Sequence, residues 1–265
     1  MKYGLIIGSS GGLANACIND AFNDEYTLFC CDIKYKEISV TSNIHHIPLD
    51  ATKNDDVKNV YEYVSSVTSK LDFIANFQGI VTLGSLVELP IETLDKIVNI
   101  NLCSVYRVNS TFFPLLKNGK GRYINILSEY SKICAIPFHG YYGITKHALE
   151  VYNDSLRREL QASGVRVVGI RPGAFKTNMQ SNIMRQFDEM VSNTEMYKEP
   201  LEKMKHIMVG ELVKAKDAKV FVKTFKKALN NKRPKRYYNV RNSLKMKLLT
   251  ILPMWLQDYA FKKFL

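Results

Sequence analysis

A tyrosine, a lysine and a serine near the middle of the chain are the residues best suited to move a proton. Tyr142 and Lys146 lie four positions apart in HGYYGITKHALE (139–150), which has a helical pattern, so their side chains share one face. A free phenol has a pKa of about 10, and a neighbouring ammonium favours the phenolate, so we expect the pKa of Tyr142 to fall. Ser128, upstream, can hydrogen-bond and polarise a substrate oxygen. The same spacing also occurs on ordinary amphipathic helices, so the rest of the chain must decide between the two interpretations.

Three further side chains beside this pair are rivals for the same role. Tyr141 lies five positions before Lys146 and therefore points off the shared face. His139 and His147 flank the pair, but no triad partner or metal-ligand spacing surrounds them. We interpret both histidines as loop and surface residues, and we predict no metal site.

The first apolar run leads into a glycine-rich turn that suits a phosphate. In GSSGGLANA, Gly8 and Gly12 are followed by Ala14, between an expected strand and an expected helix. Glycine permits positive φ and close approach of the backbone to a phosphate, and the helix start adds N–H groups and the positive end of its dipole. We predict a dinucleotide cradle from this turn: Gly8, Ser10, Gly11, Gly12 and Leu13.

An acidic residue follows the second apolar run. Asp32 ends FCCDIK, 24 residues after Gly8. A carboxylate at this place can accept both hydroxyl hydrogens of an adenosine ribose and repels a 2′-phosphate, which favours NAD(H) over NADP(H) as the cofactor. Lys34, two residues on, could partly neutralise a phosphate, and Asp32 could also be a plain turn residue.

These residues lie in a chain whose apolar pattern alternates between strand-length and helix-length segments. Strand-length runs occupy 3–7, 26–31, 43–49, 72–77, 122–127 and 165–170, with a further short run at 236–240. Helical periodicity fills 13–22, 54–67, 91–113 and 141–163, and again about 214–230. This alternation predicts an α/β fold, a single doubly wound Rossmann domain over residues 1–265 with a parallel sheet of about seven strands flanked by helices.

In this order the motifs resemble those of the short-chain dehydrogenase/reductase family, in its branch of roughly 250 residues. The matching stretches lie within about 3–180: GSSGGLA, LDAT (49–52), NFQG (76–79), NINLCSVY with Asn101, INILSEY with Ser128, the Tyr142/Lys146 pair and RPGAFKTNM (171–179). The resemblance implies further cofactor contacts, from Asp50, Ala51, Asn76, Gly79, Tyr142, Lys146, Pro172, Gly173 and Thr177. The chain departs from the family at Phe77 and Gln78, where NNAG is usual, and at Ala14, usually a glycine.

The resemblance implies an NAD(H)-dependent oxidoreductase that interconverts a secondary alcohol and a ketone. Tyr142 would be the general acid/base, and Ser128 would polarise the substrate oxygen. Lys146 would hold the nicotinamide ribose, and Asn101 would hold a water that links Lys146 to solvent. One alternative is a dinucleotide-binding sensor or scaffold of the same fold without turnover. Another is a sugar-nucleotide epimerase or dehydratase, although those relatives usually have a longer substrate domain and a G-x-x-G-x-x-G turn.

The segment at about 174–210 has no strand pattern, is rich in methionine, and is expected to form an irregular lid over the substrate. Apolar side chains from this segment and two other loops would line the pocket: Phe175, Met179, Ile183, Met184, Phe138 and Leu83. They suit an apolar or bulky alcohol or ketone, such as a steroid, a lipid or a long-chain compound. Sugars and small polar carbonyls are the alternative.

Charge is concentrated at the end of the chain. Residues 201–265 hold 17 Lys and Arg against 4 Asp and Glu, a balance of +13, whereas the whole chain carries +12. The tail at about 242–265 mixes apolar residues with lysines, as an amphipathic helix would. We expect it to pack on a partner subunit of a homo-oligomer or on its own chain, with peripheral membrane contact as the alternative. No recognition fold accompanies the basic residues, so we predict no nucleic-acid binding.

The cysteines and the chain's apolar runs indicate its compartment. The five cysteines, at 17, 30, 31, 103 and 134, are odd in number and lack metal-ligand spacing, and Cys30 and Cys31 are expected to be small buried hydrophobes. The start of the chain has no pattern of a secretory leader, and no run approaches the roughly 20 apolar residues that cross a bilayer. We therefore expect a cytoplasmic protein.

Overall fold

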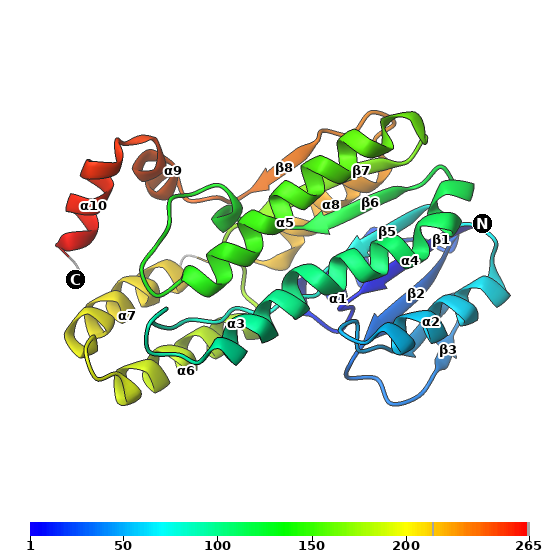
Figure 1. Ribbon diagram of the computed structural model, residues 1–265. Helices are drawn as coiled ribbons and strands as arrows, with labels where there is room; N and C mark the ends of the chain where they lie inside the picture. The colour runs from blue at the N-terminus through cyan, green and yellow to red at the C-terminus, as the bar shows by residue number, and fades with distance from the viewer. Residues whose placement is uncertain (214, 264–265) are drawn as a thin grey trace.

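The computed structural model describes residues 1–213 and 215–263, and its centre is a sheet with the strand order β3-β4-β2-β1-β5-β6-β7-β8 (Figure 1). The strands are β1 (Lys2–Ile7), β2 (Tyr26–Asp32), β3 (Ser39–Thr41), β4 (Ile44–Pro48), β5 (Phe73–Asn76), β6 (Arg122–Ile126), β7 (Arg166–Pro172) and β8 (Tyr237–Val240). All neighbouring strands are parallel except β3 and β4. The predicted doubly wound α/β fold is confirmed. Among the strands of the described residues, the apolar pattern did not indicate the exposed antiparallel strand β3.

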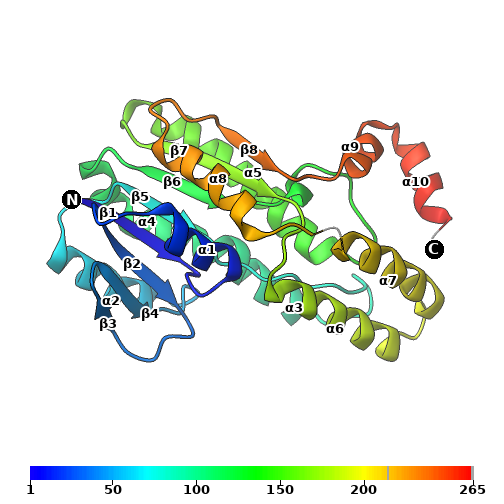
Figure 2. The same ribbon diagram turned by 180° about the vertical axis from the view of Figure 1, so that it is seen from behind.

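Helices cover both faces of this sheet (Figures 1 and 2). On one face, α1 (Gly12–Ala21) and α8 (Ala218–Asn230) share a buried apolar cluster with the strands. On the other face lie α2 (Asn54–Val67), α4 (Ser104–Asn118) and α5 (Gly140–Glu159). Every residue of β2 is buried, and such a continuous run, rather than an alternating one, is typical of a strand covered on both sides.

The order in which strands are added reverses at β1: β2, β4 and β3 lie on one side of it, and β5 to β8 lie on the other. β1 pairs with β2 on one side and with β5 on the other. Folds of this kind bind ligands in the crevice beyond the carboxyl ends of the strands at this point. α3 (Ile91–Val98) runs into α4 near that crevice through a π-helical turn (Asn99–Cys103), and two short 3₁₀ helices lie at Glu129–Ser131 and Leu160–Ala162.

Residues 174–210 are not irregular, as the sequence suggested, but form α6 (Asn178–Asn193) and most of α7 (Lys198–Val213). Ile183, Phe187 and Met190 recur at helical spacing on α6 and pack with Leu83 and Phe138 in a small separate cluster. The polar, methionine-rich composition of the segment hides this spacing.

The tail forms two helices, α9 (Leu244–Ile251) and α10 (Met254–Lys262), rather than the single predicted helix. Leu252 is extended because the residue before a proline avoids helical geometry, and Pro253 precedes the first turn of α10. Neither helix contains a buried residue. Among the described residues, no helix has the length and apolar content needed to cross a bilayer.

Candidate active site

A cavity of about 1190 Å³ at the carboxyl ends of the strands brings together most of the predicted site residues. Two predicted residues, Asn76 and Asn101, are not part of its lining. The others line it: Gly8, Ser10, Gly11, Gly12, Leu13, Asp32, Asp50, Ala51, Gly79, Ser128, Tyr142, Lys146, Pro172, Gly173 and Thr177. The cavity therefore joins the glycine turn to the Tyr142/Lys146 helix in one continuous space.

The glycine turn leaves room where side chains would block it. Gly8 has φ +73°, and a Cβ at this position would lie 2.7 Å from the backbone nitrogen of Gln78. A Cβ on Gly12 would lie 2.8 Å from Cγ2 of Thr177. No side chain caps the start of α1, so its N-terminal N–H groups remain available to an anion. The turn thus fits the phosphates of a dinucleotide.

Asp32 is held at the end of β2 with its carboxylate at the cavity. Its Oδ2 accepts a hydrogen bond from Ser10 N and its Oδ1 accepts one from Lys34 N, both at 3.0 Å. Each oxygen keeps a second lone pair, so the carboxylate can still accept hydroxyl hydrogens of a ribose. The side chain of Lys34 also lines the cavity.

Tyr142 lies beside both Ser128 and Lys146. The Tyr142 hydroxyl shares a hydrogen bond with the side chain of Ser128. Lys146 Nζ lies 5.7 Å from the centroid of the Tyr142 ring and donates to Ile126 O at 3.1 Å. Tyr141 is buried elsewhere, where its hydroxyl donates to Ser85 O at 3.4 Å, and it does not line the cavity. Of the two adjacent tyrosines, Tyr142 lines the cavity and Tyr141 does not.

The prediction that the pKa of Tyr142 falls is wrong for the chain without a bound cofactor. Burial raises the pKa of Tyr142 to about 12, the hydrogen bond with Ser128 lowers it only in part, and the charge of Glu129 raises it. Burial also lowers the pKa of Lys146 to about 8, which weakens the ammonium that was expected to stabilise a phenolate. Desolvation by burial is the largest cause of both shifts.

Asn101 lies in the π-helical turn and is fully buried beside the cavity. Its Oδ1 accepts from Ile80 N at 2.8 Å, and its Nδ2 donates to Ile80 O at 2.9 Å and to Thr145 Oγ1 at 3.1 Å. A Cβ on Gly79 would lie 3.3 Å from this Oδ1 and 3.6 Å from Lys146 Nζ. Asn101 therefore ties the 79–80 loop to α5 next to Lys146, and the water relay expected of it stays a prediction.

Asn76 faces away from the cavity, into a chain of buried amides that the sequence analysis missed. Its Nδ2 donates to Asn109 and Asn125 Oδ1, both at 2.8 Å, and Asn125 Nδ2 donates to Asn153 Oδ1 at 2.9 Å. Gln78 Nε2 donates to Asn76 Oδ1 at 3.3 Å. The available signal was the recurrence of asparagine within otherwise apolar stretches such as RYINIL.

His139 is not a surface residue, as predicted, but is buried and lines the cavity. Its ring stacks on Tyr130 with centroids 5.4 Å apart and lies 6.2 Å from the ring of Phe187. Burial lowers the pKa of His139 to about 4. The error follows from the unrecognised helix α6, because Phe187 on that helix covers the histidine. His147 is exposed, as expected.

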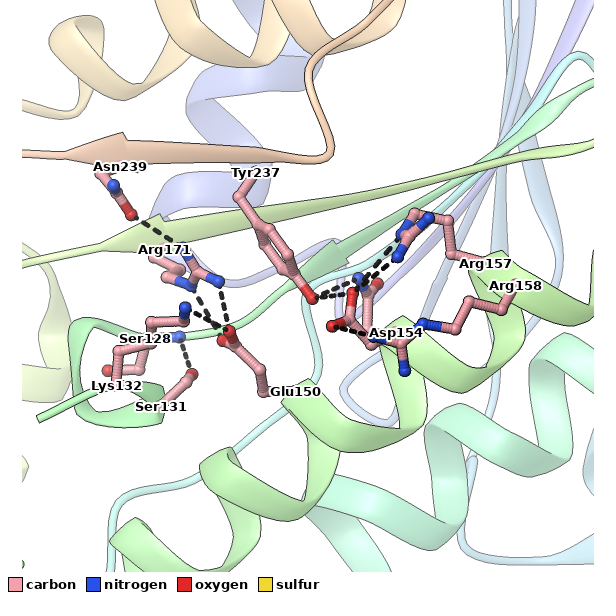
Figure 3. Close-up of polar contacts among 11 residues, drawn as sticks. Ser128, Ser131, Lys132, Glu150, Asp154, Arg157, Arg158, Arg171, Tyr237 and Asn239 are labelled. Atoms are coloured by element: carbon pink, nitrogen blue, oxygen red, sulfur yellow. Dashed lines mark hydrogen bonds and ion pairs between the residues drawn. The ribbon is translucent and has the colours of Figure 1, made fainter. Parts of the chain in front are cut away.

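A buried ion pair anchors α5 to the sheet one turn beyond Lys146 (Figure 3). Glu150 on α5 accepts two hydrogen bonds from Arg171 on β7, one from Nε at 2.8 Å. Lys132 lies 3.9 Å from the same carboxylate, and the guanidinium carbon of Arg171 lies 3.7 Å from the ring centroid of Tyr237. The cluster fixes the helix that carries Tyr142 and Lys146 against β7 and the loop after Ser128.

Comparisons with known proteins agree with this geometry. The model of the short chain dehydrogenase family matches residues 2–188. A probable short-chain type dehydrogenase/reductase of Helicobacter pylori is 28% identical over 263 residues, covering 97% of this chain and 96% of the relative. The NADPH-dependent 1-acyldihydroxyacetone phosphate reductase of Schizosaccharomyces pombe is 29% identical over 68% of this chain and 62% of its own. A short chain dehydrogenase family protein of Francisella tularensis shares the fold, with a TM-score of 0.72 and 23% identity over 88% of this chain and 92% of its own.

Proposed function

Because this chain belongs to the short-chain dehydrogenase family, we propose that it interconverts a secondary alcohol and a ketone with a nicotinamide dinucleotide. The family consists of oxidoreductases with a Rossmann fold that bind NAD or NADP. The observation that carries the proposal is the convergence of Ser128, Tyr142 and Lys146 on the cavity that the glycine turn also lines. The bound nicotinamide supplies or accepts the hydride, and the protein supplies orientation and proton movement.

Tyr142 is the acid/base in this proposal. Its hydroxyl and that of Ser128 hold the substrate oxygen between them, and Tyr142 gives that oxygen a proton in reduction or takes one in oxidation. A pKa of about 12 keeps Tyr142 protonated near neutral pH, which supports reduction of a ketone. Lys146, with its pKa lowered to about 8, is the group that can restore the proton. Asn101 holds the preceding residue, Thr145, by a hydrogen bond.

The substrate end of the cavity supports an apolar alcohol or ketone. Side chains from α6, α7, α9 and α10 line it beyond Tyr142: Met179, Ile183, Met204, Met246, Leu249 and Phe261. The helices α6 and α7 serve as the lid over this end, in place of the irregular lid expected from the sequence. A steroid, a lipid or another long-chain compound fits such a lining better than a sugar does.

NAD(H) is the preferred cofactor in this proposal. The carboxylate of Asp32 lies at the end of β2, where it would bind ribose hydroxyls and repel a 2′-phosphate. The Schizosaccharomyces pombe relative is named for NADPH, and Lys34 also lines the cavity. The binding of NADH and that of NADPH are therefore both to be measured.

A homo-oligomer and a reducing compartment complete the proposal. Tyr106 on α4 and Ile144 and Val151 on α5 are large apolar side chains that are 60%, 46% and 67% exposed, which supports a subunit contact over these two neighbouring helices. The five cysteines are free, which supports the cytoplasm.

The variant Tyr142→Phe tests the assignment. We expect it to reduce turnover of alcohols or ketones at least about 100-fold while NADH binding, measured by nucleotide fluorescence, persists. Tyr141→Phe is the matched control, since it removes a neighbouring hydroxyl outside the cavity and should retain turnover. Comparable turnover by Tyr142→Phe would remove Tyr142 from its role. An unaltered chain that binds NADH and turns over no alcohol or ketone would instead favour a sensor or scaffold.

A further inference from the structure

The two tail helices display an apolar face that nothing in the described chain covers. Seven large apolar side chains of this segment are exposed: Leu244, Leu248, Ile251, Leu252, Met254, Trp255 and Tyr259. Leu244, Ile251 and Met254 are 74–76% exposed, and Trp255, the one tryptophan of the chain, is 68% exposed. Figures 1 and 2 show α9 and α10 extending from the end of the molecule where α6 and α7 also lie.

Other side chains of the same two helices belong to the cavity. Met246 and Leu249 on α9 and Phe261 on α10 line it, and they are only partly exposed. Ser243 N donates to Glu129 Oε2 at 2.7 Å, and Cys134 N donates to Thr250 Oγ1 at 3.0 Å. The tail is thus fastened to the loops that follow Ser128 and separates the cavity from the outside.

Positive charge surrounds the apolar face. Residues 241–263 carry five cations against the single acid Asp258: Arg241, Lys245, Lys247, Lys262 and Lys263. Within the described chain none of the five forms an ion pair, although Lys263 Nζ lies 5.0 Å from the centroid of the Tyr259 ring. Apolar side chains, an interfacial tryptophan and tyrosine, and flanking lysines together are the composition of a helix that lies in the plane of an anionic lipid surface.

We propose that α9 and α10 dock on an anionic lipid bilayer, with the apolar side chains in the interface and the cations at the headgroups. A second copy of the chain fits less well, because a two-fold contact would place the same basic face against itself. Tyr106, Ile144 and Val151 already offer a separate apolar face.

Docking in this orientation would open the cavity toward the bilayer, since the helices that touch lipid also line the substrate end. The substrate class expected from such an opening is an alcohol or ketone dissolved in the membrane, with an apolar body and one reactive oxygen. This consequence for the substrate rests on the proposed function, whereas the docking does not.

Vesicle sedimentation of the full chain tests the docking. The chain should bind vesicles of phosphatidylcholine with phosphatidylglycerol at least about tenfold more tightly than vesicles of phosphatidylcholine alone, and added salt should weaken the binding. Trp255→Ser, and separately the pair Lys262→Gln and Lys263→Gln, should each weaken it about tenfold or more. The matched control pair, Lys223→Gln and Lys226→Gln, changes exposed lysines on α8 and should leave binding unchanged.

The outcomes of these experiments distinguish the lipid docking from the proposed enzymatic function. NADH binding and turnover of a water-soluble ketone should be the same in the Trp255→Ser variant, because Trp255 does not line the cavity. Absence of vesicle binding, equal binding to both vesicles, or a change from dimer to monomer on Trp255→Ser in light scattering would overturn the docking. Vesicle binding by a chain that turns over no alcohol or ketone would uphold the docking and overturn the proposed function.

Discussion

His139 should make the folded protein sensitive to mild acid. The side chain is 4% exposed, and burial lowers its pKa from 6.5 to about 4. A histidine in the unfolded chain keeps a pKa of about 6.5. Between these two values the unfolded chain binds a proton that the folded chain does not, so the free energy of unfolding falls as the pH falls.

The size of this effect follows from the two pKa values. They differ by about 2.5, and one pKa unit corresponds to about 1.4 kcal/mol, so the full loss below pH 4 is about 3 kcal/mol. Between pH 7 and about pH 5 the loss is about 2 kcal/mol, because the unfolded histidine is by then almost fully protonated. His139→Phe keeps a planar ring between Tyr130 and Phe187 but cannot bind the proton.

Urea unfolding followed by circular dichroism, at fixed protein concentration and without nucleotide, measures the effect. The free energy of unfolding of His139→Phe, relative to the unaltered chain, should rise by about 2 kcal/mol from pH 7 to about pH 5, whatever the difference at pH 7. His147→Asn changes an exposed histidine on α5, and its curve should run parallel to that of the unaltered chain. A difference between His139→Phe and the unaltered chain that stays constant over this range would refute the reasoning.

Three other substitutions test the cofactor site and the buried ion pair between Glu150 and Arg171. Asp32→Ala should weaken NADH binding about tenfold and NADPH binding less, as measured by nucleotide fluorescence, and an unchanged ratio would contradict its assignment to the ribose. Glu150→Ala leaves a buried guanidinium without its carboxylate and should lower the free energy of unfolding in urea by about 3 kcal/mol or more; a loss of less than about 1 kcal/mol would mean that the pair is not desolvated. Gly8→Ala places a Cβ 2.7 Å from Gln78 N at positive φ, so nucleotide binding should be lost and stability should fall by about 1 to 2 kcal/mol. Gly210→Ala, whose Cβ would meet nothing, is the control and should stabilise the chain by up to about 1 kcal/mol.

The central strands of the sheet were predictable because they are buried on both faces. YTLFCC and RYINIL are short, nearly continuous apolar runs bounded by polar turns, and β2 and β6 coincide with them to within a residue. The predicted positions of Tyr142, Ser128 and Lys146 on the cavity depended on that alternation, since the loops after parallel strands all emerge at one edge of the sheet.

The errors lie where tertiary packing, rather than local pattern, decides the outcome. His139 is buried between the ring of Tyr130 and that of Phe187, which lies 48 residues further along the chain on α6. The polar, methionine-rich sequence of α6 concealed that helix. The expected fall in the pKa of Tyr142 depended on charge proximity alone, whereas the magnitude of desolvation requires the packed surroundings. Asn76 was assigned from its place in a motif, and its side chain turns inward to Asn109 and Asn125 because buried amides must find partners.

The cysteines divide into two groups that a thiol-alkylating reagent would label at very different rates. Cys17, Cys30 and Cys31 are 0% exposed, and burial raises the pKa of Cys30 to about 12, so the reactive thiolate is absent until the sheet itself opens. Cys103 and Cys134 are partly exposed, and the backbone nitrogen of Cys134 donates to Thr250 of α9. Mass spectrometry of the alkylated peptides would therefore time two separate events in one sample, the opening of the whole domain and the release of its tail.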